Sequence, residues 1–200
     1  MNQARIFFNG EGDKWHERNR KSEINYAVVD AITGLDFKPN SILEIGCGSA
    51  RYLGELHRYY GCRCVGIDPS AQALAQGRKD NPALILRHDM AVTAMSAEFA
   101  HLQTHDLIVF GFCLYLLDRE DVMMAVAFSD GILRKGGYIA IHDFDVKEPK
   151  KAPYKHKDGV FTYKMDYPSL WLANPEYSLV FKTTTAEGEA ITIIRRTGWP

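Results

Sequence analysis

Short apolar runs recur along the middle of the chain, each separated from the next by a stretch with helical periodicity. Apolar runs bounded by turn residues are typical of buried strands, whereas Leu53, Leu56 and Tyr60 recur at the spacing of one helix face. The pattern predicts five strands, at 41–45, 62–67, 84–87, 106–111 and 138–142. Strands that alternate with helices favour a parallel sheet covered by helices on both faces.

The two ends of the chain follow other patterns. Segment 13–35 predicts one helix, whose apolar face holds Ile24, Ala27, Val28, Ala31 and Ile32. Segments 178–185 and 190–196, separated by a short turn, predict a hairpin, and the region before them predicts an irregular insert. The expected fold class is therefore α/β. We expect a Rossmann-like, doubly wound, mostly parallel sheet of seven strands with a C-terminal antiparallel hairpin and an N-terminal lid helix.

Length and composition suit one domain over 1–200. We divide it into a lid helix (1–35), a cofactor-binding core (36–145), a substrate-side insert (146–177) and the terminal hairpin (178–200). The formal net charge of −1 lacks the basic footprint of a nucleic-acid binder. No apolar run reaches the length of a membrane span, and the N-terminus lacks the core of a signal peptide.

The cysteines bear on metal binding and on the cellular compartment. None of the four forms a C-x-x-C pair, so we expect no metal and a reduced, cytoplasmic protein. Cys62 and Cys64 would point to opposite faces of an extended strand.

The first strand ends in a tight glycine turn that predicts a cofactor site. Gly46 and Gly48, on either side of Cys47, let the backbone bend and approach a ligand, and a helix follows with its free N–H groups. Glu44 is a carboxylate at the end of an apolar strand, which is costly unless it binds something. These features indicate a nucleoside-type cofactor. A dinucleotide fingerprint needs a small residue where this chain has Arg51, which disfavours that alternative.

Asp68 follows the second strand, and Pro69 suits the first position of the next helix. Ligands of open α/β sheets bind at the carboxyl ends of the strands, where a carboxylate can accept hydrogen bonds from ribose hydroxyls. NAD enzymes use the same contact, so Asp68 supports a nucleoside without choosing which one. Capping of the helix is a second role compatible with the first.

The sequence Glu44-Ile45-Gly46-Cys47-Gly48-Ser49-Ala50 resembles the first motif of the class I S-adenosylmethionine-dependent methyltransferases, with Ala50 at the usual third glycine. The resemblance continues through the other strand ends. It implies adenine contacts for Asp89 and Met90, contacts with the methionine part of the cofactor for Phe110 and Gly111, and a family turn at 133–137. S-adenosylmethionine is therefore the expected cofactor, and the terminal hairpin is similar to the ending of that family.

Methyl transfer needs alignment and exclusion of water rather than a covalent intermediate, but a hydroxyl acceptor also needs a base. Candidate catalytic residues are His142, Asp143 and Tyr115. The chain lacks the Asn/Asp-Pro-Pro-Tyr sequence of nucleobase N-methyltransferases after the fourth strand, which disfavours a nucleic-acid substrate.

The substrate side is expected to come from the N-terminal segment and the insert. The insert carries six lysines interleaved with aromatic residues, which suits an anionic ring-bearing small molecule such as a sugar or small acid, although lysines also solubilise exposed loops. Segments 157–167 and 170–175 resemble small bacterial methyltransferases of surface-sugar pathways. An NAD-type oxidoreductase and a non-catalytic cofactor binder stay open as alternatives, as does the oligomeric state.

Overall fold

The computed structural model describes residues 2–23, 25–90, 104–185 and 188–199. Its main sheet has seven strands in the order β3-β2-β1-β4-β5-β9-β8. These strands are β1 (Ser41–Ile45), β2 (Arg63–Asp68), β3 (Ile85–His88), β4 (His105–Gly111), β5 (Leu133–Phe144), β8 (Tyr177–Thr184) and β9 (Glu189–Arg196). The first five are parallel, and β9 and β8 are antiparallel to their neighbours, which confirms the predicted fold class.

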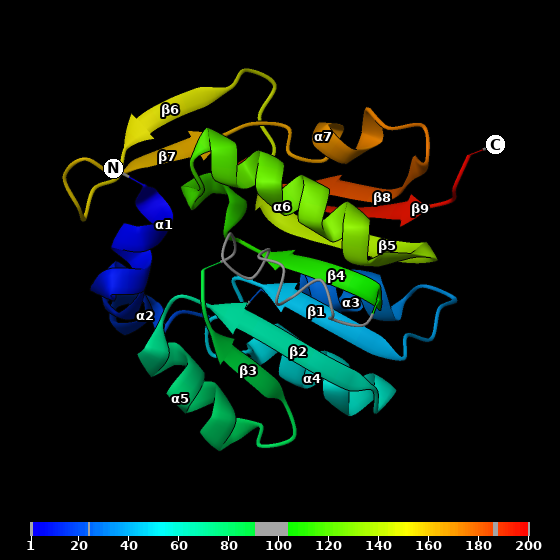
Figure 1. Cartoon of the computed structure of the whole chain (residues 1–200), viewed down its shortest axis with the longest axis horizontal. Helices are drawn as coiled ribbons and strands as arrows, with labels where there is room; N and C mark the ends of the chain where they lie inside the picture. Colours follow the sequence, from blue (N-terminus) through cyan, green and yellow to red (C-terminus); the bar gives the residue numbers. More distant parts are fainter. Residues whose placement is uncertain (1, 24, 91–103, 186–187, 200) are drawn as a thin grey trace.

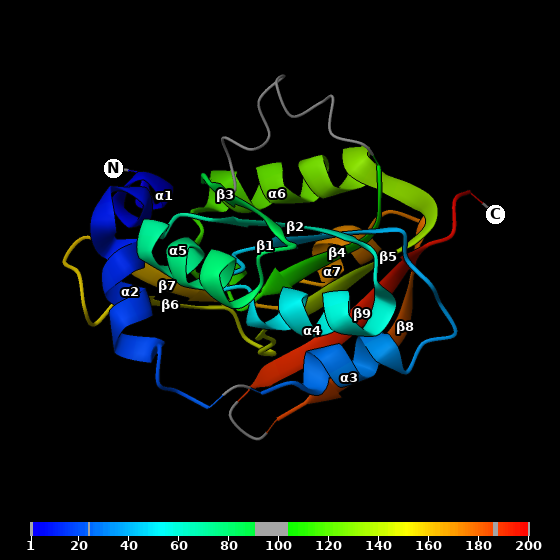
Figure 2. The same cartoon turned by 90° about the horizontal axis from the view of Figure 1, so that it is seen from below.

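Apolar residues of the central strands alternate between two hydrophobic cores. Leu43 and Ile45 face the core formed with α6 (Arg119–Ile132) and α7 (Ser169–Leu172). Ile42 faces the opposite core, together with α3 (Ala27–Thr33), α4 (Arg51–Tyr60) and α5 (Ala71–Asp80). Helices therefore cover both faces of the sheet (Figures 1 and 2).

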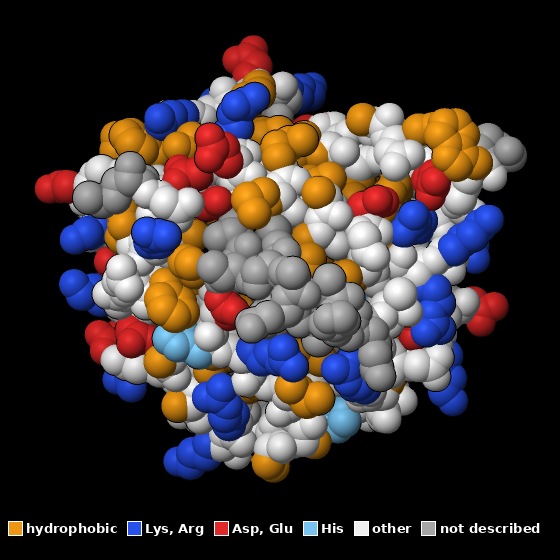
Figure 3. Space-filling view, viewed as in Figure 1, with side chains coloured by type: hydrophobic (Ala, Val, Ile, Leu, Met, Phe, Trp, Pro, Cys, Tyr) orange, Lys and Arg blue, Asp and Glu red, His pale blue; other side chains and the backbone are white. Residues whose placement is uncertain are grey.

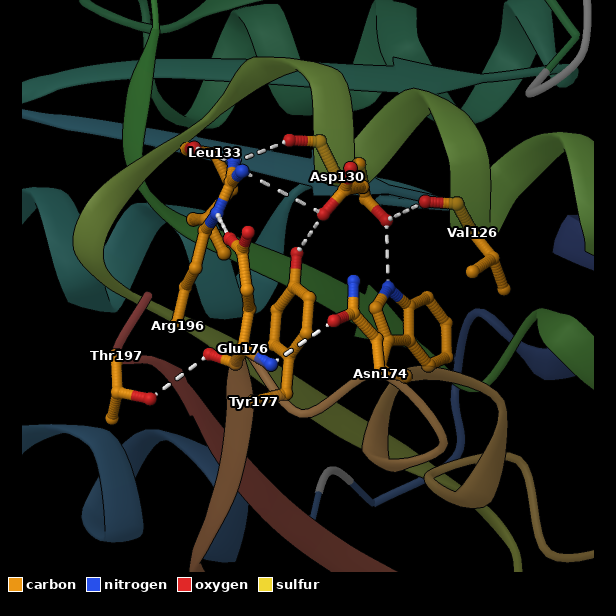
Figure 4. A network of polar contacts seen from close by, with 10 residues as sticks. Val126, Asp130, Leu133, Asn174, Glu176, Tyr177, Arg196 and Thr197 are labelled. Atoms are coloured by element: carbon orange, nitrogen blue, oxygen red, sulfur yellow. Dashed lines mark hydrogen bonds and ion pairs between the residues drawn. The ribbon is translucent and has the colours of Figure 1, made fainter. Parts of the chain in front are cut away.

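The C-terminal hairpin is held to α6 by a polar network (Figure 4). The Tyr177 hydroxyl donates to Asp130 over 2.7 Å, and the Arg196 guanidinium donates to the carbonyls of Asp130 and Leu133. Strand β9 lies between β5 and β8 and is antiparallel to β5. Its first residue, Glu189, therefore lies beside the carboxyl end of β5.

The N-terminal segment is not the single helix predicted for 13–35. Helices α1 (Gln3–Ile6) and α2 (Gly12–Asn19) flank a kink at Phe7–Glu11, where Asn9 and Gly10 leave the helical backbone conformation, and α3 begins only at Ala27. The break has a physical cause, because the carbonyls of Arg20 and Ser22 accept hydrogen bonds from the Arg51 side chain instead of from later turns of a helix. Ile24 lies outside the described residues.

The insert is more regular than expected. It contains a two-stranded sheet of β6 (Lys150–Pro153) and β7 (Phe161–Lys164), followed by α7, which packs onto the core through the fully buried Trp171. Gln3 ties this small sheet to the N-terminus, because its amide donates to the Phe161 carbonyl and accepts from the Phe161 N–H.

The thiols of Cys62 and Cys64 lie 3.8 Å apart, contrary to the expectation of opposite faces. The expectation was wrong because residues two apart along an extended strand point to the same face.

Basic and acidic side chains are interspersed over the face that Figure 3 shows. Among the described residues, no helix has the length and apolar character needed to cross a membrane.

Candidate functional site

A cavity of about 520 Å³ opens at the carboxyl ends of the parallel strands. It is lined by the glycine turn after β1, by the ends of β2, β4 and β5, and by residues of α1, α2 and the segment that follows them. In Figure 1, α1 and α2 lie beyond the arrowheads of β1 and β2, on the side to which these strands point. The topology therefore creates the cavity where open α/β sheets bind their ligands.

The glycine turn has the conformation its sequence predicts. Gly46 and Gly48 have φ values of 74° and 53°, in the left-handed region that glycine tolerates. Ala50, at the third glycine position of the motif, is also left-handed with φ 57°, and it is fully buried. A Cβ on Gly46 would lie 2.5 Å from the Cβ of Cys113, so this position has room only for glycine.

Asp68 braces the same turn. One carboxylate oxygen accepts from the Gly48 N–H over 2.7 Å, and the other accepts from the Ser70 N–H over 2.8 Å. Burial raises the pKa of Asp68 to about 6, against the opposing effect of these two bonds. Each oxygen keeps capacity for a second donor, and Asp68 and Pro69 both line the cavity.

Glu44 is the most unusual group of the cavity. Its side chain is buried, and its Oε2 has no hydrogen-bond partner within the described part of the chain. Burial raises its pKa well above the usual range, although the Leu53 N–H donates to the carboxyl. A buried carboxyl with an open acceptor is costly, and a cationic or donor ligand would offset that cost.

Gly111 has no side chain, which leaves space beside the Glu44 carboxyl. A Cβ there would lie 2.7 Å from Glu44 Oε1 and 3.5 Å from the ring of Tyr52. In the sheet, Gly111 pairs with His142 of β5. The missing side chain thus opens the floor of the cavity between β1 and β5.

Of the three other residues predicted to contact the cofactor, only one lines the cavity. Met90 lines the cavity, whereas Asp89 is not among its lining residues, and the Asp89 N–H donates to the Asp68 carbonyl. The Phe110 side chain is fully buried against Trp171, with ring centroids 5.4 Å apart, and does not reach the cavity. The adenine contact of Asp89 stays a prediction, and for Phe110 only a backbone contact remains open.

Among the candidate catalytic residues, His142 alone lines the cavity. Its Nδ1 lies 3.2 Å from the Tyr52 hydroxyl, and its Nε2 lies 3.6 Å from a carboxylate oxygen of Glu189. Burial lowers the pKa of His142 and so favours the neutral ring, an effect that Glu189 opposes. Tyr52 and Glu189 also line the cavity, and the sequence analysis missed both. One available signal was that Tyr52 follows the glycine turn within the first turn of its helix.

Asp143 and Tyr115 are not brought to the cavity. The carboxylate of Asp143 accepts from the N–H groups of Leu114 and Tyr115 through one oxygen and from that of Phe144 through the other. Asp143 therefore fixes the loop after β4 on the far face of β5, since neighbours along a strand point to opposite faces. The Tyr115 hydroxyl accepts from the side chain of Trp15, which itself lines the cavity.

Basic side chains of the cavity come from the N-terminal half rather than from the insert. His16, Arg20 and Arg51 line it, and the pKa of His16 is lowered by burial and by the two neighbouring guanidinium groups. No residue of the insert lines the cavity, and Lys151 and Lys164 lie over aromatic rings outside it. Within the described residues, no group of three or more His, Cys, Asp or Glu side chains could hold a metal ion.

Comparisons with known proteins agree with this geometry. Residues 42–137 match the family described as "Methyltransferase domain". An "Uncharacterized methyltransferase" of Alkaliphilus oremlandii is 27% identical over 129 residues, which cover 62% of this chain and 55% of the relative. The chain thus spans about half the length of that curated relative.

Two solved structures that resemble the chain were determined with S-adenosylhomocysteine. The N-methyltransferase NodS of Bradyrhizobium japonicum has a TM-score of 0.68 at 16% identity, covering 99% of this chain and 100% of its own. A Burkholderia thailandensis 1,6-didemethyltoxoflavin-N1-methyltransferase, also with bound 1,6-didemethyltoxoflavin, has a TM-score of 0.68 at 14% identity, covering 96% and 85%. At these identities the likeness shows the fold.

Proposed function

We infer that this chain is a class I S-adenosylmethionine-dependent methyltransferase, which binds that cofactor in the cavity and transfers its methyl group to a small molecule. The single observation that carries the inference is the convergence of the glycine turn, Asp68 and the unpartnered Glu44 carboxyl on one cavity. The turn supplies backbone N–H groups and a close approach, and Asp68 has acceptor capacity for ribose hydroxyls.

The residues present fit the cofactor at its charged end. The methionine part of the cofactor carries an ammonium and a sulfonium, and Glu44 Oε2 offers a buried acceptor with no partner in the described chain. A cation beside Glu44 would favour its ionised form and reverse the upward pKa shift that burial imposes. Gly111 keeps the adjoining space open.

When bound, the cofactor supplies a methyl group that is already activated by its positive sulfur. The protein then has to align an acceptor and exclude water. Trp15 and the break after α2 border the cavity, and Arg51 holds that break through the Arg20 and Ser22 carbonyls. This part of the N-terminal segment is our candidate for the lid.

For the acceptor we propose an anionic small molecule, such as a small acid or an acidic sugar. The support is the pair of guanidinium groups that line the cavity, those of Arg20 and Arg51, because cations lining a cleft raise the local concentration of anions. The expectation from the sequence rested on the lysines of the insert, whereas the present proposal rests on these arginines. A cytoplasmic protein without a nucleic-acid substrate remains part of the proposal.

A screen with methyl-labelled cofactor against small acids, sugars and amino acids tests the function. We expect label transfer by the wild type and its loss in Gly46→Ala, whose new Cβ would lie 2.5 Å from the Cβ of Cys113. Gly61→Ala is the matched control, because Gly61 also has a positive φ, 65°, but a Cβ there meets nothing within 4 Å. It carries the backbone strain without the contact.

Three outcomes separate the alternatives. Label transfer that Gly46→Ala abolishes and Gly61→Ala keeps supports the proposal. Binding of S-adenosylhomocysteine without transfer to any acceptor favours a non-catalytic binder, and binding of NAD alone favours an oxidoreductase. Either of the last two would overturn the proposed function.

A further inference from the structure

We propose that Tyr52, His142 and Glu189 form a proton relay that takes the proton of an acceptor hydroxyl, so that the site methylates oxygen. The inference rests on the proposed function and deepens it, because it names the acceptor atom. The three side chains come from α4, β5 and β9, and all three line the cavity.

The chain of contacts has a defined direction. The Glu189 carboxylate can only accept, so the His142 Nε2, 3.6 Å from it, carries the ring proton of the neutral imidazole. The His142 Nδ1 is then an acceptor, and the Tyr52 hydroxyl, 3.2 Å away, is its donor. The order carboxylate, imidazole, hydroxyl is the arrangement by which a hydroxyl proton can pass to a histidine.

The fold brings the three groups together on one face of the sheet. His142 pairs with Ile191 of β9, and Glu189 lies two residues before Ile191, on the same face as His142. Across the other edge of β5, Gly111 pairs with His142 and leaves room for the Tyr52 ring, which would lie 3.5 Å from a Cβ there. The Tyr52 hydroxyl therefore adjoins the floor of the cavity that also borders Glu44.

Phe112 packs against the imidazole of His142 in a strained backbone conformation. It has a φ of 58°, a left-handed conformation that is strained for an aromatic residue, and its N–H donates to the His142 carbonyl over 2.8 Å. Its ring centroid lies 5.3 Å from that of His142. Strain of this kind gathers at functional sites, where the surrounding structure holds it in place.

The burial of the His142 ring distinguishes this arrangement from simple packing. Besides Glu44 Oε2, His142 Nε2 is a buried polar atom at the cavity that has no hydrogen-bond partner within 3.5 Å in the described residues. A purely structural imidazole would be more stable with a partner at normal hydrogen-bond distance. The long contact to Glu189 instead suits an ion pair that shortens when the ring gains a proton.

The proposed step balances as follows. The acceptor oxygen forms a bond to the methyl carbon while the carbon–sulfur bond breaks, and the sulfur keeps that electron pair as a thioether. The acceptor proton passes to the Tyr52 oxygen as the Tyr52 proton passes to His142 Nδ1, and Glu189 stabilises the resulting imidazolium. Tyr52 never carries a net charge, which is consistent with the pKa of its phenol being raised by burial and by Glu44 and Glu189.

The test compares Tyr52→Phe with Tyr60→Phe. Tyr60 lies on the same helix, and its hydroxyl donates only to the Ile32 carbonyl, so its variant removes a hydroxyl without touching the cavity. With the acceptor found by the labelled-cofactor screen, we expect Tyr52→Phe to lower kcat at neutral pH roughly 100-fold or more, the usual worth of a positioned base. Affinity for S-adenosylhomocysteine, measured by calorimetry, should stay unchanged in both variants.

The pH profile and a spectroscopic measurement exclude a merely structural role. The loss in Tyr52→Phe should shrink as the pH rises, because hydroxide ionises the acceptor and replaces the relay. Nitrogen NMR of the complex with S-adenosylhomocysteine should show His142 protonated at Nε2, and Glu189→Gln should lower the pKa of that ring.

Each contrary result is separable from failure of the proposed function. If S-adenosylhomocysteine binds and an acceptor is methylated, but Tyr52→Phe has unchanged kcat or a loss independent of pH, the relay is overturned while the function stands. Methylation at nitrogen, or His142 protonated at Nδ1, would also overturn it. If no acceptor is methylated at all, the proposed function itself fails.

Discussion

Gly111→Ala is the most direct perturbation of the floor of the cavity. The backbone of Gly111 lies outside the positive-φ region, so alanine is allowed there and only its Cβ matters. That Cβ would lie 2.7 Å from Glu44 Oε1, which is closer than a carbon and an oxygen atom pack without a bond between them. The buried carboxyl must move away from the Leu53 N–H that donates to it.

Two magnitudes follow from this contact. Overpacking of a filled site costs about 1–3 kcal/mol of unfolding free energy. If Glu44 also holds the charged end of the cofactor, loss of one charge-assisted hydrogen bond of about 1.5–3 kcal/mol weakens binding roughly 10- to 100-fold. Urea unfolding measures the first quantity, and calorimetric titration with S-adenosylhomocysteine measures the second.

Gly131→Ala is the control for this experiment. Gly131 lies within α6, and a Cβ there meets nothing within 4 Å, so the variant should gain about 0.5–1 kcal/mol of stability and bind the ligand as the wild type does. If Gly111→Ala bound S-adenosylhomocysteine with unchanged Kd, Glu44 would not be a cofactor group and the reasoning from its unpartnered oxygen would be wrong.

Asp68→Asn should weaken S-adenosylhomocysteine binding about tenfold or more by calorimetry, because the amide keeps only one acceptor oxygen in place of two. Equal affinity would mean that Asp68 only stabilises the turn. Arg51→Ala removes the guanidinium that holds the backbone after α2, so limited trypsin digestion should cut this segment faster, and an unchanged rate would show that the contact is dispensable. Ser129→Ala leaves the buried Trp171 Nε1–H without its acceptor at 2.9 Å and should cost about 1–3 kcal/mol in urea unfolding; an unchanged midpoint would contradict that assignment.

Much of the fold and of the cofactor side was predictable from local patterns. Glu44, Gly46 and Asp68 follow directly from the ends of two strands, and the carboxyl ends of parallel strands must meet at one edge. The turn residues could be recognised because their positive φ values restrict which side chains fit.

The acceptor side could not be predicted in the same way. Glu189 reaches the cavity only because β9 inserts between β5 and β8, and a hairpin pattern does not say which of its strands pairs inward. His142 and Asp143 are neighbours that point to opposite faces, so a strand end alone could not select between them. The N-terminal break depends on Arg51 contacting carbonyls about 30 residues earlier, a tertiary contact that helical periodicity does not contain.

The choice of cofactor can be measured by calorimetric titration of the wild-type protein with S-adenosylhomocysteine and, separately, with NAD. We expect saturable binding of one S-adenosylhomocysteine per chain and no heat from NAD, because the turn, Asp68 and Glu44 converge on one cavity and Arg51 stands where a dinucleotide site needs a small residue. Binding of NAD with no response to S-adenosylhomocysteine would contradict this expectation.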